Sequence, residues 1–133
     1  MTRTLADLNQ AADDFLAEYK LATLATLRAD GTPHVCAVGF TIDREAGVAR
    51  VITSGGSQKA INAERRGRAA LTHVDGPRWL TVEGTARVLR DAASVRDAEN
   101  RYEARYRKPR VNPARVVIEV TVTRVMGSAS MFD

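Results

Sequence analysis

The residues best suited to chemistry lie in the segment 51–62, which reads VITSGGSQKAIN. Gly55 and Gly56 let the backbone turn sharply and approach a ligand closely, because no Cβ stands in the way. Ser57 is suited to cap a helix that starts there. Lys59 then falls in the first helical turn, where the helix dipole disfavours a cation. An anion bound at the helix start would reverse that effect, so the pattern indicates a phosphate site.

A plain connector is the alternative interpretation of this segment. Strand–Gly–Gly–helix turns are common, and a first-turn lysine such as Lys59 can extend into water. The segment has neither the Gly-Lys-Ser/Thr order of a Walker A loop nor the G-x-G-x-x-G pattern of a dinucleotide site. The local pattern favours the two interpretations about equally.

The remaining reactive side chains do not form a recognisable catalytic set. His34 and His73 fall in different expected strands without a Cys, Asp or Glu at ligand spacing, so we expect no metal site. No G-x-S-x-G elbow or Cys/His pairing marks a nucleophile. Glu83 alternates to one face of a strand, where it faces either a cleft or solvent. No catalytic residue is assigned, and a bound cofactor is the expected carrier of the chemistry.

Composition is that of an ordinary soluble domain, with 133 residues, 44% hydrophobic and 27% charged. We expect a single domain over 1–133. No apolar run approaches the roughly 20 residues of a membrane span, and the first residues lack the apolar core of a signal peptide. The lone Cys36 fits a reducing cytoplasm, which is the expected location. The formal charge of +4 favours anionic partners without choosing among them.

Hydrophobic periodicity predicts a mainly β, α+β chain with an antiparallel sheet closed into a small barrel and flanking helices. Gly67 is expected to end the central helix in the left-handed conformation, and Gly84 to mark a bulge. No alternating βαβ units occur, so a doubly wound fold is not expected. The predicted helices cover 4–19, 58–66 and 91–107, and the predicted strands cover 21–28, 33–43, 48–53, 68–74, 78–90 and 114–125.

Two basic stretches stand out, at 65–68 and at 101–110. Each is more often a solvated face than a binding site. A nucleic-acid-binding barrel would need interleaved aromatic side chains, and aromatic residues make up only 5% of the chain. We therefore expect no nucleic-acid partner.

Several segments together resemble the pyridoxamine 5′-phosphate oxidase-like split-barrel superfamily. The hairpin 24–35 resembles the opening of that fold, 52–62 its phosphate-binding strand and helix, and 78–84 its next characteristic strand. With the segments 107–113 and 116–120, the pattern is similar to the actinobacterial flavin/deazaflavin oxidoreductases. The resemblance covers nearly the whole chain.

The resemblance implies a homodimer with two cofactor sites at the subunit interface. It implies that the deazaflavin coenzyme F420 is the cofactor, with FMN as the alternative. Lys59 would pair with the cofactor phosphate, and Trp79 occupies a position where flavin-binding relatives often have a polar amide, which favours F420. The full set of cofactor-binding residues implied in this way is Val38, Gly39 and Phe40 through backbone contacts with the ring, Ile52 and Thr53 beside it, Ser57, Gln58, Lys59 and Asn62 around the phosphate, and Trp79.

The reaction implied is hydride transfer from the reduced deazaflavin to a conjugated acceptor, with biliverdin as the leading substrate. Biliverdin carries two propionates, for which Arg107, Arg110 and Arg115 are plausible partners. Two alternatives stay open: an FMN-binding oxidoreductase of the same fold, and a non-catalytic protein that binds flavin or F420. No proton donor is assigned.

Overall fold

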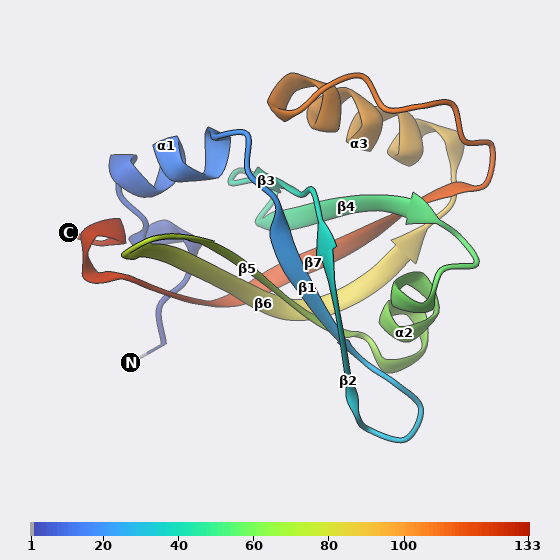
Figure 1. Cartoon of the computed structure of the whole chain (residues 1–133), viewed down its shortest axis with the longest axis horizontal. Coiled ribbons are helices and arrows are strands. Elements are labelled where there is room, and N and C mark those ends of the chain that lie inside the picture. The colour runs from blue at the N-terminus through green and yellow to red at the C-terminus, as the bar shows by residue number, and fades with distance from the viewer. Residues whose placement is uncertain (1) are drawn as a thin grey trace.

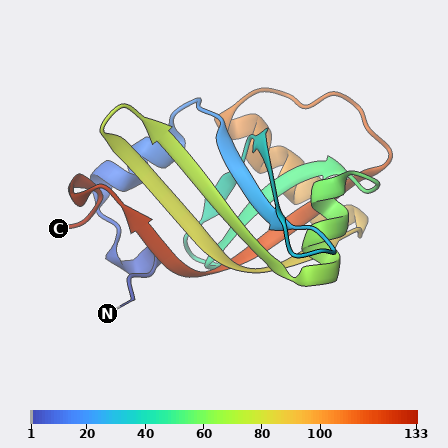
Figure 2. The ribbon, with the colours of Figure 1, turned by 60° about the horizontal axis from the view of Figure 1, so that its bottom comes forward.

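Seven antiparallel strands form one sheet in the computed structural model, which describes residues 2–133. The sheet order is β2-β1-β5-β6-β7-β4-β3, so the two edge strands follow each other in the chain and the sheet curls around a shared interior (Figures 1 and 2). This arrangement confirms the predicted mainly β barrel. The strands are β1 Ala22–Leu27, β2 Pro33–Val38, β3 Thr41–Asp43, β4 Val48–Ser54, β5 Arg68–Asp75, β6 Arg78–Leu89 and β7 Arg115–Gly127.

Three α-helices flank the barrel: α1 Gln10–Ala17, α2 Gln58–Arg66 and α3 Ala92–Arg105. Helix α2 packs on β1 and β6 at one end, α1 lies near both termini at the other, and α3 lies over β4 and β7 (Figure 1). Two short 3₁₀ turns, η1 Leu5–Asp7 and η2 Ala129–Met131, complete the elements. No helix within residues 2–133 is long and apolar enough to cross a membrane.

Helix α2 has the bounds that its sequence predicts. Ser57 precedes it, and the Ser57 hydroxyl accepts a hydrogen bond from the Ala60 N–H at 3.3 Å. Gly67 ends it with φ +67°, the left-handed conformation that glycine adopts at little cost.

The N-terminal helix predicted over 4–19 is wrong in its extent. Leu8 leaves the helical path to form a β-bridge with Phe132, so a 3₁₀ turn precedes the break and α1 begins only at Gln10. Asn9 caps α1, since its Oδ1 accepts from the Ala12 N–H at 3.0 Å. Tyr19 lies beyond the helix and is 61% exposed.

The strand predicted over 33–43 is also wrong, because the chain breaks into β2 and β3 at Gly39 and Phe40. A Cβ at Gly39 would lie 2.9 Å from the Tyr102 ring and 3.1 Å from the Tyr106 ring. Tyr102 in α3 and Tyr106, the residue that follows α3, therefore pack against the backbone where the strand stops.

The predicted bulge at Gly84 is confirmed. The register between β6 and β7 shifts between Glu83 and Gly84. A Cβ at Gly84 would lie 1.8 Å from the Thr121 carbonyl oxygen, a distance no side chain tolerates. The bulge helps a long strand bend around the barrel.

The core fills the barrel with apolar side chains and one histidine. His73 of β5 is fully buried, stacked on Phe15 at 4.0 Å between ring centroids and edge-on to Phe40 at 6.0 Å. Neither ring nitrogen has a hydrogen-bond partner within residues 2–133. Burial, assisted by the nearby Arg105 charge, lowers the pKa of His73 to about 4, so the imidazole is neutral at physiological pH.

Candidate functional site

A pocket of about 610 Å³ opens where the N-terminus of α2 faces the loop between α3 and β7. Its residues come from the end of β2, the end of β4, the turn 54–57 that contains Gly55 and Gly56 (the glycine turn), the start of α2, helix α3, the loop after α3 and the start of β7. Among the residues that the structure describes, no Asp or Glu lines it. The lining residues are Ala37, Val38, Gly39, Ile52, Thr53, Ser54, Ser57, Lys59, Tyr102, Arg107, Lys108, Pro109, Arg110, Asn112 and Arg115.

The glycine turn is fixed by hydrogen bonds on both sides. Gly55 N–H donates to the Ala114 carbonyl at 2.9 Å, and Ser57 N–H donates to the Ser54 carbonyl at 3.1 Å. The Thr53 and Ser57 hydroxyls lie 3.1 Å apart. The turn therefore presents the start of α2 to the pocket in a defined orientation.

Lys59 gives this helix start its positive charge. The first turn of α2 contains no acidic residue. Lys59 lines the pocket and forms no ion pair with any carboxylate of residues 2–133. Unbonded N–H groups, the helix dipole and the ammonium group together favour an anion, as the sequence indicates.

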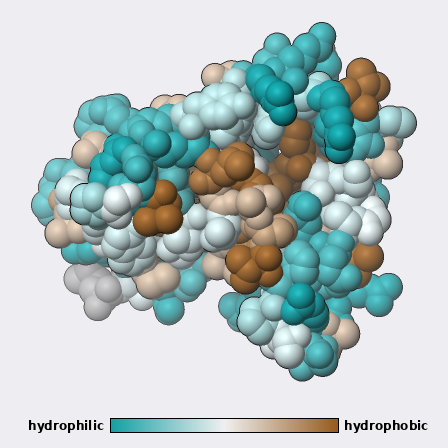
Figure 3. Space-filling view, in the orientation of Figure 1, coloured by the Kyte–Doolittle hydropathy of each residue, from teal (hydrophilic) through white to brown (hydrophobic). Residues whose placement is uncertain are grey.

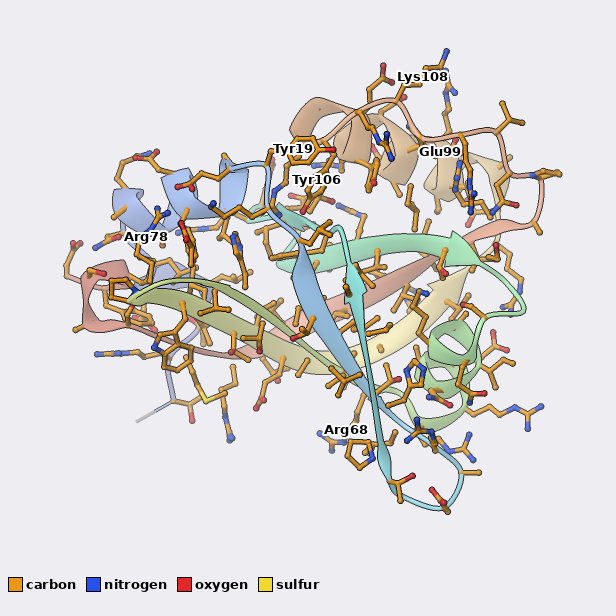
Figure 4. All side chains as sticks on the ribbon, in the orientation of Figure 1. Tyr19, Arg68, Arg78, Glu99, Tyr106 and Lys108 are labelled. Atoms are coloured by element: carbon orange, nitrogen blue, oxygen red, sulfur yellow. The ribbon has the colours of Figure 1, made fainter. Side chains whose placement is uncertain are left out.

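The opposite wall is the basic loop after α3. Arg107, Lys108 and Arg110 are exposed, and none is ion-paired with the rest of residues 2–133 (Lys108 is labelled in Figure 4). Asn112 ties this loop to the glycine turn, because its side-chain amide donates to the Ser54 hydroxyl at 3.0 Å. The two walls are thus joined at one end.

Arg115 differs from the other arginines of the pocket. Its guanidinium lies 2.8 Å from the Glu99 carboxylate, and its side chain is only 7% exposed. The charge is therefore largely balanced within the protein, and the pair anchors β7 to α3.

Arg105 and Tyr106 hold the broken strand in place. The Tyr106 hydroxyl accepts from the Phe40 N–H at 3.2 Å and donates to the Lys20 carbonyl at 2.8 Å. The Arg105 guanidinium donates to the Phe40 carbonyl at 2.5 Å and to the Glu18 carbonyl at 2.9 Å. Burial raises the pKa of Tyr106 and lowers the pKa of Arg105. The end of α3 is thereby bonded to the backbone beside the pocket.

The structure brings most of the predicted site residues together and leaves four outside the pocket. Asn62 is fully buried, donating to the Thr26 hydroxyl at 3.1 Å and accepting from the Gln58 amide at 2.7 Å. Asn62 therefore joins α2 to β1, and Gln58 holds the Asn62 amide in place. The predicted residues that line the pocket are Val38, Gly39, Ile52, Thr53, Ser57, Lys59, Arg107, Arg110 and Arg115.

The other two exceptions are Phe40 and Trp79. Phe40 is buried, and its N–H and carbonyl are already bonded to Tyr106 and Arg105. Trp79 lines a separate pocket with residues that include Arg3 and the C-terminal residues of the chain.

Tyr102, Lys108 and Asn112 line the pocket but have no assigned role in the sequence-based prediction. Tyr102 and Tyr106 lie four residues apart, and that spacing places them on one face of a helix. The spacing alone indicates packing. Only the fold shows that one ring of the pair reaches the pocket.

Comparison with known proteins agrees with this architecture. The family model described as pyridoxamine 5′-phosphate oxidase matches residues 8–128. The chain belongs to the pyridoxamine 5′-phosphate oxidase family. This confirms the superfamily that the sequence resembles.

Relatives within this family include a protein of Mycobacterium tuberculosis (strain CDC 1551 / Oshkosh) named F420H(2)-dependent biliverdin reductase. It is 59% identical over 133 residues, covering 100% of this chain and 97% of the relative. A solved structure named F420 reductase is 27% identical with a TM-score of 0.70, covering 90% of this chain and 98% of that one. A conserved hypothetical protein from Mycobacterium tuberculosis has a TM-score of 0.77 at 25% identity, covering 96% of this chain and 89% of that one.

Proposed function

We propose that this chain is an F420H₂-dependent reductase that transfers a hydride to biliverdin, giving bilirubin. The observation that carries the proposal is the 59% identity, over the whole chain, with the protein named F420H(2)-dependent biliverdin reductase. The expected enzyme class and coenzyme agree with that relative. The cytoplasmic location stays a prediction.

The pocket suits a polyanionic coenzyme. F420 carries a phosphodiester and carboxylates, and the pocket offers Lys59, an open helix start and a lining without acidic residues among those described. In this proposal Lys59 pairs with the phosphate, and Ser57 orients the turn. When bound, F420H₂ supplies the hydride. The protein binds and orients the reactants, and it provides positive charge where they are negative.

The acceptor's propionates are assigned to the basic loop. Arg107 and Arg110 line the pocket without an ion-pair partner in the described chain, whereas Arg115 is already held by Glu99. Arg107 and Arg110 are therefore the better partners, and Arg115 supports the wall.

A homodimer is the proposed assembly. Val35, Val74, Trp79 and Met126 are 37–64% exposed and point outward from the barrel strands. Figure 3 shows apolar atoms gathered over the middle of the face that carries β1 and β2. Exposed apolar side chains of this kind are typical of a protein–protein interface, and a second copy would also give Trp79 a route to the coenzyme.

Mass measurement by light scattering during size exclusion tests the dimer. The variant Val74→Arg should shift the mass toward one chain, because it places a charge in the apolar face. Val111→Arg is the matched control, since Val111 is 95% exposed on the basic loop. A wild-type mass of one chain would remove the dimer from the proposal.

Side-by-side spectral titration tests the coenzyme and the reaction. We expect F420 to bind in the micromolar range or tighter and FMN more weakly. Under anaerobic conditions, biliverdin should oxidise F420H₂ only when the protein is present. Failure of F420 to bind would overturn the proposal, and a purified protein that releases FMN on denaturation would favour the flavin alternative.

A further inference from the structure

We infer that Tyr102 is a specificity-determining residue whose ring forms the wall on which the conjugated plane of the acceptor lies. The inference rests on the proposed function and adds a residue to it. Tyr102 is the only aromatic side chain that lines the pocket among the described residues. It is partly exposed there, so one side of the ring is available to a ligand.

Packing holds the Tyr102 ring in one place. Its edge lies so close to Gly39 that any Cβ there would meet it at 2.9 Å. Behind it stands Tyr106, with ring centroids 4.9 Å apart and planes tilted by 36°. Tyr106 is itself bonded to Phe40 and Lys20 through its hydroxyl. The ring is therefore fixed before any ligand arrives, which lowers the entropy cost of stacking.

The position of Tyr102 in the pocket indicates that its ring contacts the acceptor rather than the coenzyme. Tyr102 lies on α3, immediately before the loop that carries Arg107 and Arg110, whereas Lys59 and the glycine turn form the other side. A planar conjugated molecule with carboxylates can place its π-system on Tyr102 and its carboxylates on those arginines. Aromatic rings favour such offset stacking with planar π-systems.

Equilibrium binding of biliverdin tests this without turnover. Visible absorbance titrations would be run with oxidised F420 bound, on Tyr102→Leu, Tyr102→Phe and wild type. Tyr19→Leu is the matched control. The Tyr19 ring packs edge-on to the Tyr106 ring, with 5.2 Å between centroids, and does not line the pocket (Figure 4).

Tyr102→Leu should weaken biliverdin binding about tenfold, the size of one aromatic stacking contact, and should raise KM more than it changes kcat. Tyr102→Phe should stay within about threefold of wild type, because the ring remains. The affinity for F420 alone should be unchanged in both variants. Tyr19→Leu should bind biliverdin as wild type does.

Wild-type biliverdin affinity in Tyr102→Leu would overturn the inference. So would a loss confined to F420 binding, which would place the ring against the coenzyme. If the wild-type protein binds F420 but not biliverdin, the acceptor in the proposed function is wrong. If the wild-type protein binds biliverdin and Tyr102→Leu binds it more weakly, the acceptor is right and the loss is due to Tyr102. Thermal melting of each variant separates a binding effect from loss of the fold.

Discussion

Lowering the pH from about 7 to about 5 should destabilise the protein mainly through one group, the imidazole of His73. The folded state keeps this ring neutral down to about pH 4, whereas the unfolded chain protonates it near pH 6.5. Between these values only the unfolded state binds the proton, so the free energy of unfolding falls as the pH falls. Above pH 6.5 both states are neutral and the effect disappears.

Linkage gives the size of the effect. Each pH unit within that window removes about 1.4 kcal/mol, so about 2 kcal/mol is lost between about pH 7 and about pH 5. Two ion-paired or hydrogen-bonded aspartates act at lower pH than this range. The pKa values of Asp43 and Asp75 are lowered from 3.8 by hydrogen bonds, to Ala46 N–H and to Arg78 respectively, so their contribution is lost at more acidic pH.

Urea unfolding at several pH values, followed by the fluorescence of Trp79, measures the slope. The variant His73→Leu should flatten it, because the titrating group is gone and the site between Phe15 and Phe40 stays apolar. Equal slopes in wild type and His73→Leu would refute the reasoning.

Three further predictions follow from the same structure. Lys59→Ala should raise the Kd for F420 about 10- to 100-fold with unchanged circular dichroism, because a charge-assisted contact is worth about 1.5–3 kcal/mol; an unchanged Kd would remove Lys59 from the site. Gly84→Ala should lower the unfolding free energy by about 2 kcal/mol or more, since its Cβ would overlap a β7 carbonyl, whereas Gly56→Ala has open space and should cost far less. Tyr106→Phe should cost about 1–3 kcal/mol in urea unfolding by leaving buried backbone groups unpaired, and Tyr19→Phe, at an exposed ring, should be near neutral.

Local signals predicted the elements that depend on neighbouring residues. Ser57 and Gly67 fix the ends of α2 through their own side chain and backbone, and both are visible in the sequence. Gly84 marked the bulge because a glycine inside a strand pattern is itself a signal, although the contact that requires it, with Thr121, is distant in the chain. The barrel itself followed from β-forming runs separated by short turns.

Long-range contacts decided what the sequence could not show. Leu8 pairs with Phe132, at the opposite end of the chain, and that bridge interrupts a helical pattern that is otherwise regular. The strand break at Gly39 depends on two tyrosines more than sixty residues later. Neither the helix break at Leu8 nor the strand break at Gly39 can be predicted from the propensities of neighbouring residues.

The same limit applied to the site. The glycine turn and Lys59 could be found from spacing, because both lie in one short segment. Tyr102 could not, since its helical pattern predicts only a packed face. The resemblance placed Trp79 in the site, and the fold puts it in another pocket of the same chain.

The bond between the Phe40 amide and the Tyr106 hydroxyl gives the protein a built-in reporter. An amide that donates to a side chain exchanges its hydrogen with water at a rate set by that side chain rather than by a sheet ladder. Deuterium uptake at Phe40 therefore follows the seating of the last turn of α3. If the acceptor stacks on Tyr102 as inferred above, its binding should slow this exchange and leave the amides of α2 unchanged, so mass spectrometry should distinguish acceptor binding from coenzyme binding.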